Sequence, residues 1–291
     1  MALFQLYVWP HHLLILSPAF VSAEHRHHAA QIAFGLSRPV VFESPVTGLQ
    51  RADMLLIPPN TLHAHPAFGA SAFLYLEPES IEWAHFSGHG NGRFVPLPFK
   101  KQLRSLARRA VAGDAVAAQS LVDALIGQSS GRSPGSDALI SRACTLIRRS
   151  LDGPIALADL AQAVHLSPSR LAHRFRDATG VPVRRYVLWC RLRAAADAAM
   201  HGATLTDAAH LAGFADSAHL SRTFRAMFGI APSLLFTPGR TAVTFCETAA
   251  GTLTVETPRV VDSPSASWAW RLRRRGRNHI RAGRSHCCEV S

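Results

Sequence analysis

Lysine and cysteine are scarce in this sequence, and long apolar runs are missing. Lys100 and Lys101 are the only lysines, so arginine carries nearly all of the positive charge. The five cysteines show neither a paired metal-ligand spacing nor a disulfide framework. No apolar segment reaches the roughly 18–20 residues that span a bilayer, and the apolar N-terminus lacks the basic start of a secretory signal. We therefore expect a cytoplasmic protein with no membrane partner.

Length and charge point to a multidomain protein with a polyanionic partner. A chain of 291 residues is long enough for two modest domains. It carries 31 Lys and Arg against 19 Asp and Glu, a formal net charge of +12. A basic excess of this size favours nucleic acid, although an arginine-rich composition by itself discriminates little.

One short pattern occurs twice in the second half of the chain. Apolar residues at helical spacing on both sides of a short break predict a helix, a turn and a second helix in each copy. Ser167 and Asp216 are good N-caps for the second helices. The first copy runs from Leu157-Ala158-Asp159-Leu160-Ala161 to Leu171, Phe175-Arg176 and Gly180, and the second from Leu205-Thr206-Asp207-Ala208-Ala209 to Leu220, Phe224-Arg225 and Gly229.

The second helix of each copy is predicted to present small and basic side chains outward. A helix-turn-helix places this helix in the major groove of DNA, where small side chains allow close approach and arginine pairs with guanine or phosphate. A helical hairpin of the core is the alternative, and two matching copies argue against it. The predicted DNA-binding residues are Ser169, Arg170, Ala172, His173 and Arg176 in the first copy and Ser217, Ala218, His219, Ser221, Arg222 and Arg225 in the second.

These residues also carry a family resemblance. The run from about Leu139 to Phe236 resembles the DNA-binding domain of AraC-type (AraC/XylS) bacterial transcription regulators, chiefly over residues 166–176, 191–195, 212–225 and 228–233. The resemblance implies two helix-turn-helix units joined by a central helix from about Pro182 to Met200. Together they would read roughly 15–20 base pairs of double-stranded promoter or operator DNA, allowing about 10 for each helical turn. RNA polymerase and a second copy of the chain are further candidate partners.

From Met1 to about Glu79 the chain has the short β-type runs of an antiparallel barrel or sandwich. His25-Arg26-His27, followed by His63 after Pro58-Pro59-Asn60, resembles the two histidine motifs of cupin barrels, so these three histidines are the predicted ligand-binding residues. Gln31, an amide, stands where a carboxylate ligand is expected, which argues against a metal or other cofactor, although three imidazoles suit one. The predicted strands are Phe4 to Val8, Leu13 to Leu16, Gln31 to Leu36, Val40 to Phe42, Met54 to Ile57 and Ala72 to Leu76.

The predicted fold class is α+β multidomain, with a cupin-like N-terminal barrel and an all-α C-terminal domain. Two helices, about 99–112 and 115–126, either dimerise, press on the DNA-binding domain or pack on the chain's own barrel. The tail is basic, and either adds phosphate contacts or is a frameshifted or read-through end. The predicted divisions are a sensor at 1–98, a helical connector at 99–127, a linker at 128–135, a DNA-binding domain at 136–238 and a weakly structured tail at 239–291.

These observations favour a ligand-responsive, sequence-specific transcription regulator over an enzyme. The N-terminal domain would sense a small-molecule effector and shift the population of DNA-competent states. A cupin-type metal-dependent enzyme with a DNA-binding appendage is the alternative, and Gln31 argues against it. A DNA alkyl-repair protein with the same module needs reactive cysteines, and the first half of the chain has none.

Overall fold

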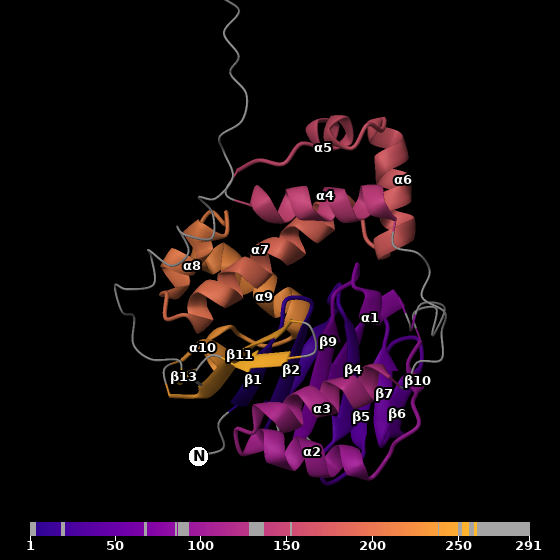
Figure 1. The fold of residues 1–291 in the computed structure, drawn as a ribbon, viewed down its shortest axis with the longest axis vertical. Coiled ribbons are helices and arrows are strands. Elements are labelled where there is room, and N and C mark those ends of the chain that lie inside the picture. Colours follow the sequence, from indigo (N-terminus) through magenta and orange to yellow (C-terminus); the bar gives the residue numbers. More distant parts are fainter. Residues whose placement is uncertain are drawn as a thin grey trace, which may run out of the picture.

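The computed structural model of the chain describes residues 4–18, 21–66, 69–84, 86, 93–127, 137–151, 153–237, 239–249, 252–255 and 259–260. In this part of the chain a β-rich domain lies against a helical domain (Figure 1). The two confirm the predicted fold class, an N-terminal β domain followed by an all-α domain. No helix in the described ranges is long and apolar enough to cross a membrane.

The β-rich domain is built from two sheets. The larger has the order β10-β7-β4-β9-β2-β1-β11-β12, with β13 on β11, and the smaller has the order β3-β8-β5-β6. All pairs are antiparallel except β1 with β11. The strands are β1 (Phe4–Val8), β2 (His12–Ser17), β3 (Ser22–His25), β4 (Ala30–Gly35), β5 (Val40–Ser44), β6 (Gly48–Ala52), β7 (Met54–Ile57), β8 (His63–His65), β9 (Ser71–Leu76), β10 (Val95–Pro96), β11 (Thr241–Ala249), β12 (Thr252–Val255) and β13 (Arg259–Val260).

The large sheet is buried on both faces because its apolar side chains alternate between two cores. Leu6, Ile15 and Phe73 belong to a core that continues into the helical domain. Tyr7 and Leu14, their chain neighbours, belong to a second core on the opposite face. Successive side chains of a strand point to opposite faces, so near-continuous apolar strands fit a sheet that is covered on both sides.

Helices α2 (Gln102–Val111) and α3 (Ala115–Ile126) cover the outer face of the large sheet (Figure 1). Leu103 and Leu121 are buried in the outer core, and the Tyr7 hydroxyl donates to the Ala110 carbonyl at 2.6 Å. Of the three predicted roles for these helices, packing on the chain's own β domain is the one that the contacts support. The short helix α1 (Ile81–Ala84) follows the large sheet's strand β9.

The helical domain has a central helix with helix pairs on either side. The apolar surface of the central helix α7, including Tyr186 and Leu192, is buried in the core that both units share. The predicted central helix therefore agrees with the structure to within one residue at its start. The elements are α4 (Ala138–Arg149), α5 (Leu157–Ala163), α6 (Pro168–Thr179), α7 (Val183–Met200), α8 (Leu205–Leu211), α9 (Ser217–Phe228) and α10 (Ser233–Phe236).

Strand β11 corrects the prediction of a weakly structured tail from residue 239. It runs parallel to β1, with Phe4 opposite Thr241 and Val8 opposite Phe245, and Val243 and Cys246 are buried. The chain thus returns from the helical domain and completes the sheet of the N-terminal domain. Strand β11 also pairs antiparallel with β12, with Cys246 opposite Val255. The rest of the basic tail, residues 261–291, and the predicted linker at 128–135 lie outside the described residues.

Candidate functional site

The first helix-turn-helix unit consists of α5 and α6. The Ser167 hydroxyl caps α6 by accepting from the Arg170 amide, and Pro168 occupies the first helical turn, where its missing N–H is not needed. Leu171 and Phe175 are buried against the rest of the unit. The helix ends at Gly180, whose left-handed backbone (φ 73°) is a common helix stop.

The second unit repeats this construction in α8 and α9. Thr204 caps α8, and the Asp216 carboxylate caps α9 by accepting from the His219 amide at 2.6 Å. Leu220 and Phe224 are buried, and α9 ends at Gly229 with φ 69°. The predicted caps Ser167 and Asp216 therefore coincide with the structure, and the repeated leucine and phenylalanine are buried in both copies.

None of the predicted DNA-contacting side chains is buried in the described structure. Ala172, Ser217 and Ser221 are half-buried, and the other eight are exposed. His173 lies 3.3 Å from Asp177, whereas Arg170, Arg176, Arg222 and Arg225 have no ion pair within the described part of the chain. Exposed arginines on the outer face of a second helix are available to phosphate or guanine. Their contacts with DNA stay a prediction.

Both second helices end against the β-rich domain. The Gly229 carbonyl accepts from the Ala23 amide of β3 at 2.9 Å, and the Gly180 carbonyl accepts from the side-chain amide of Asn60 at 3.3 Å. A Cβ added at Gly229 would lie 2.6 Å from Nδ1 of His25. In the sequence Gly229 is recognisable only as a repeated position, because contacts across domains leave no local periodic signal.

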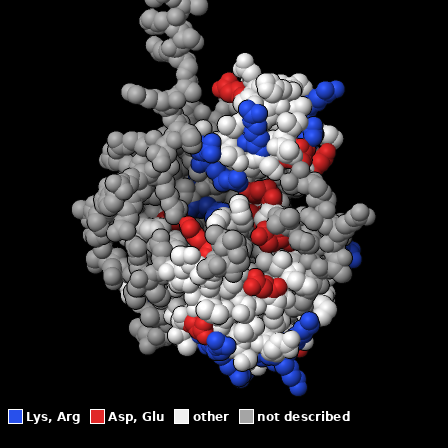
Figure 2. All heavy atoms as spheres, viewed as in Figure 1, with Lys and Arg blue, Asp and Glu red and all other residues white. Residues whose placement is uncertain are grey.

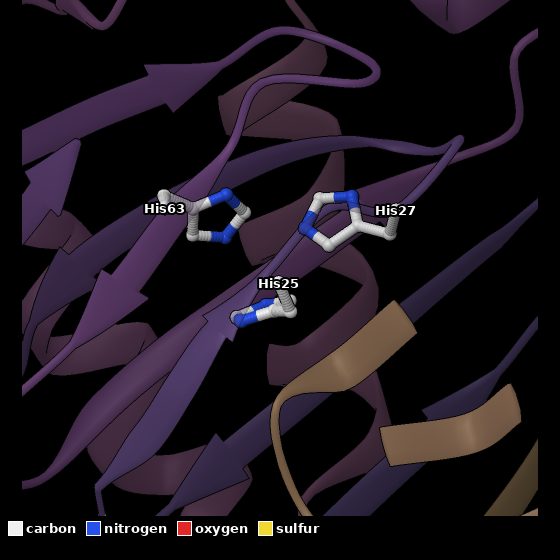
Figure 3. A group of neighbouring side chains, drawn as sticks. All are labelled: His25, His27 and His63. Carbon is white, nitrogen blue, oxygen red and sulfur yellow. The ribbon is translucent and has the colours of Figure 1, made fainter. Parts of the chain in front are cut away.

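The three predicted ligand-binding histidines come together at this junction. His25 ends β3, His27 follows it, and His63 begins β8. Ring centroids lie 4.2 Å apart for His25 and His63, 5.0 Å for His27 and His63 and 5.7 Å for His25 and His27. The side chains point toward one another, and an orange segment of the helical domain runs beside His25 (Figure 3).

Each of these histidines is oriented by a backbone carbonyl. Nδ1 lies 2.8 Å from the carbonyl of Ala23 for His25, of Ala29 for His27 and of Thr61 for His63. A carbonyl only accepts, so each neutral ring has its proton on Nδ1 and its lone pair on Nε2. Burial lowers the pKa of His25 to about 3 and of His27 to about 4, and it holds the pKa of His63 well below the ordinary value. All three rings are neutral at pH 7.

Two cavities lie between the domains and share a wall. The smaller, about 80 Å³, adjoins His25 and His63 and is otherwise mostly apolar, with Phe42 from the β-rich domain and Phe224 from α9 among its lining. The larger, about 580 Å³, lies between Trp9 of the β-rich domain and Trp189 of α7. The shared wall consists of Leu13, Tyr75, Ala196, Met200 and Phe228.

A polar network joins the domains beside the larger cavity. Glu77 lies 2.7 Å from Arg193 of α7 and accepts from the Trp189 indole at 3.1 Å. Glu79 pairs with Arg148 of α4 at 2.6 Å and accepts from the Tyr186 hydroxyl. Acidic side chains gather across the middle of the molecule in Figure 2, with arginines above them. Burial raises the pKa of Glu77 to about 7 even though Arg193 opposes this rise.

Comparison with known sequences identifies the helical part of the chain. A family described as "Helix-turn-helix domain" matches residues 160–237. The transcriptional activator NphR of Rhodococcus sp is 34% identical over 97 residues. That match covers 33% of this chain and 29% of NphR, so the chain matches less than a third of the length of this curated relative.

Comparison with solved structures extends the similarity to both domains. An apo variant of ToxT from Vibrio cholerae matches with a TM-score of 0.58 and 12% identity, over 79% of this chain and 98% of the other. An unsaturated fatty acid bound form of wild-type ToxT matches with a TM-score of 0.50 and 14% identity, over 79% of this chain and 97% of the other. At these identities the similarity establishes a shared two-domain fold.

Proposed function

We propose that this chain is a transcription regulator of the AraC type whose DNA affinity responds to a small molecule, since its residues 160–237 match a helix-turn-helix domain family. The observation that carries the proposal is the duplicated unit, which presents arginines on the outer faces of two second helices. We assign the protein to the cytoplasm, and we propose that it regulates transcription and does not act as an enzyme. RNA polymerase and a second copy of the chain remain proposed partners.

In the proposed DNA complex, α6 and α9 each enter one major-groove segment. Arg170, His173 and Arg176 contact the first segment, and His219, Arg222 and Arg225 contact the second. The short side chains of Ala172 and Ala218 allow the two helices to approach the bases closely. The outward residues differ between the two copies, so the two helices read different bases and the binding site is asymmetric.

Effector binding is proposed for the cavity of about 580 Å³ between the domains. Its size falls within the range of roughly 300–1,000 Å³ that is usual for small-molecule sites. Trp9, Leu13 and Trp189 make much of its lining apolar, so an apolar or amphipathic molecule fits it best. ToxT, which shares the fold, is known in a form bound to an unsaturated fatty acid. A ligand here contacts α7 and the end of α9, and it therefore shifts the population of DNA-competent arrangements.

DNA binding is tested with the full chain and DNA from upstream of its own gene. Fluorescence anisotropy is expected to show preference for this DNA over a scrambled duplex, with an affinity that falls as salt rises. If the Arg222 side chain reads guanine, Arg222→Ala is expected to reduce the preference for that base at one position of the DNA site by about 1–3 kcal/mol. If the side chain contacts phosphate, the substitution is expected to weaken binding to all sequences alike.

The matched control is Arg108→Ala. Arg108 is an exposed arginine on α2, on the outer face of the β-rich domain, and its replacement removes the same charge far from the helix-turn-helix units. Its binding curve is expected to overlay that of the unmodified protein. Equal affinity for all duplexes in the unmodified protein would contradict sequence-specific regulation.

A further inference from the structure

The histidine cluster has the construction of a metal site. One ring nitrogen of each of His25, His27 and His63 lies within 4.8 Å of those of the other two. Because a backbone carbonyl holds every Nδ1, the nitrogen with the lone pair is Nε2 in each ring. Histidines that bind metals usually donate their other ring N–H to a carbonyl or carboxylate in this way, which fixes the tautomer and the ring orientation.

A second observation is an unpartnered nitrogen inside the cluster. His63 has no exposed surface, and its Nε2 has no hydrogen-bond partner within the described structure. Buried polar atoms are normally satisfied, so an atom of this kind calls for an explanation such as an ion. Nε2 of His27 lies 2.8 Å from the side-chain amide of Gln31, whose oxygen and nitrogen exchange places by a flip. In one orientation its nitrogen donates to His27, and in the other, which the structure has, its oxygen lies beside Nε2 of His27.

We propose that His25, His27 and His63 bind one divalent transition-metal ion, with the Gln31 side-chain oxygen as a fourth ligand. Neutral imidazoles suit zinc, nickel, copper and iron, whereas hard ions such as magnesium and calcium prefer oxygen ligands. The sequence argued against a metal because Gln31 carries no charge. The structure adds what the sequence did not show, namely carbonyl-fixed rings and an unpartnered nitrogen.

The ion would join the two segments that contact the second helices. Ala23, which binds the end of α9, lies two residues before His25, and Asn60, which binds the end of α6, lies three residues before His63. Imidazole nitrogens bind these ions at about 2.0–2.1 Å, so the ion draws β3 and the start of β8 together. If the proposed function holds, metal binding changes DNA affinity through both contacts. The binding of metal itself does not depend on that function.

The test uses the full, untagged chain after treatment with a chelator. Calorimetric titration with Zn²⁺, Ni²⁺ and Cu²⁺, in the absence of DNA, is expected to show one ion per chain for at least one of them. His63→Gln is expected to weaken that affinity by at least about tenfold. Gln31→Glu supplies an anionic ligand, and we expect it to tighten binding by about tenfold or more.

His210→Gln is the matched control, because His210 is an exposed histidine on α8, outside the cluster. The variant tests whether the metal binds to histidines on the surface. It is expected to leave affinity and stoichiometry unchanged. Absence of binding for all three ions overturns the proposal, as does binding that both His63→Gln and Gln31→Glu leave unaltered. The Gln31→Glu result decides the matter if His63→Gln does not fold. Measuring DNA binding separately distinguishes failure of this proposal from failure of the proposed function.

Discussion

At the scale of single residues, buried neutral histidines make this protein sensitive to acid. Burial lowers the pKa of His12 and of His27 to about 4, against an ordinary value near 6.5 in the unfolded chain. The unfolded chain therefore takes up protons below about pH 6.5, whereas the folded chain does so only near pH 4. The free energy of unfolding is expected to be at its full value above pH 6.5 and to fall as the pH drops toward 4.

Chemical denaturation at pH 7.5, 6.0 and 5.0 measures this loss, which approaches about 1.4 kcal/mol per pH unit for each such group. His12→Gln isolates one of the groups, because His12 lies outside the histidine cluster and stacks on Trp9 instead. Its stability is expected to fall less steeply with acid than that of the unmodified protein. Identical slopes for the two proteins would contradict a neutral, buried His12.

At the scale of helices, the two glycine stops predict different mutational costs. Gly180 and Gly229 have nearly the same left-handed backbone, with φ 73° and 69°. Alanine in this conformation costs roughly 1 kcal/mol at either position. An added Cβ meets nothing within 4 Å at Gly180, whereas at Gly229 it meets the backbone of Ala23 and Nδ1 of His25. Gly229→Ala is therefore expected to cost about 1–3 kcal/mol more, because β3 must move away from α9.

Denaturation of the two variants measures the difference, and DNA affinity is recorded alongside it. Gly180→Ala serves as the matched control, since it introduces the same backbone strain without a clash. Gly229→Ala is expected to disturb the docking of α9 on β3, and a change in DNA affinity confined to this variant would link that contact to regulation. Equal stability losses for the two variants would mean that β3 moves away from α9 without a measurable cost in free energy.

The elements differ in how far the sequence predicts them. Periodic apolar residues predict β1, β7 and α3 to the residue, and the caps predict where α6 and α9 begin. Strands β3 and β8 were not predicted because they are short and rich in polar side chains, as in Ser22–His25. The parallel pairing of β11 with β1 was not predicted either, since a contact between the two ends of the described chain depends on the whole fold. The contact of Gly229 with Ala23 was not predicted for the same reason.

For the histidine cluster, too, the sequence predicted the local site but not the contact with the helical domain. The resemblance to cupin motifs predicted a shared site for His25, His27 and His63, and the structure brings the three rings together. The sequence did not predict that Phe228 of α9 stacks near His27, with ring centroids 6.4 Å apart. A phenylalanine at helical spacing fits the core of its own unit equally well, so only the domain arrangement distinguishes the two roles.

At the scale of the whole molecule, an ion pair between the buried Glu77 carboxylate and the half-buried Arg193 ties the domains together. Replacing Arg193 by Met leaves the Glu77 carboxyl buried without its cation, which is expected to lower the free energy of unfolding by about 3 kcal/mol. Arg184→Met is the control, because Arg184 is an exposed arginine on the same helix without an ion pair in the described structure, and a change within roughly 0.5 kcal/mol is expected.

Adding Glu77→Gln to Arg193→Met separates the charge from the packing. If the unpaired carboxylate is the source of the loss, the neutral amide restores part of it, and the double variant is more stable than Arg193→Met alone. The restoration is expected to be larger at pH 8 than at pH 6, because burial raises the pKa of Glu77 to about 7 even beside Arg193 and the loss of this cation raises it further, so a proton neutralises much of the carboxylate at the lower pH. Denaturation of the four proteins at both pH values measures these differences. A double variant no more stable than Arg193→Met at pH 8 would show that Arg193 joins the domains by packing and by its hydrogen bonds to the Pro10 carbonyl, and not by its charge.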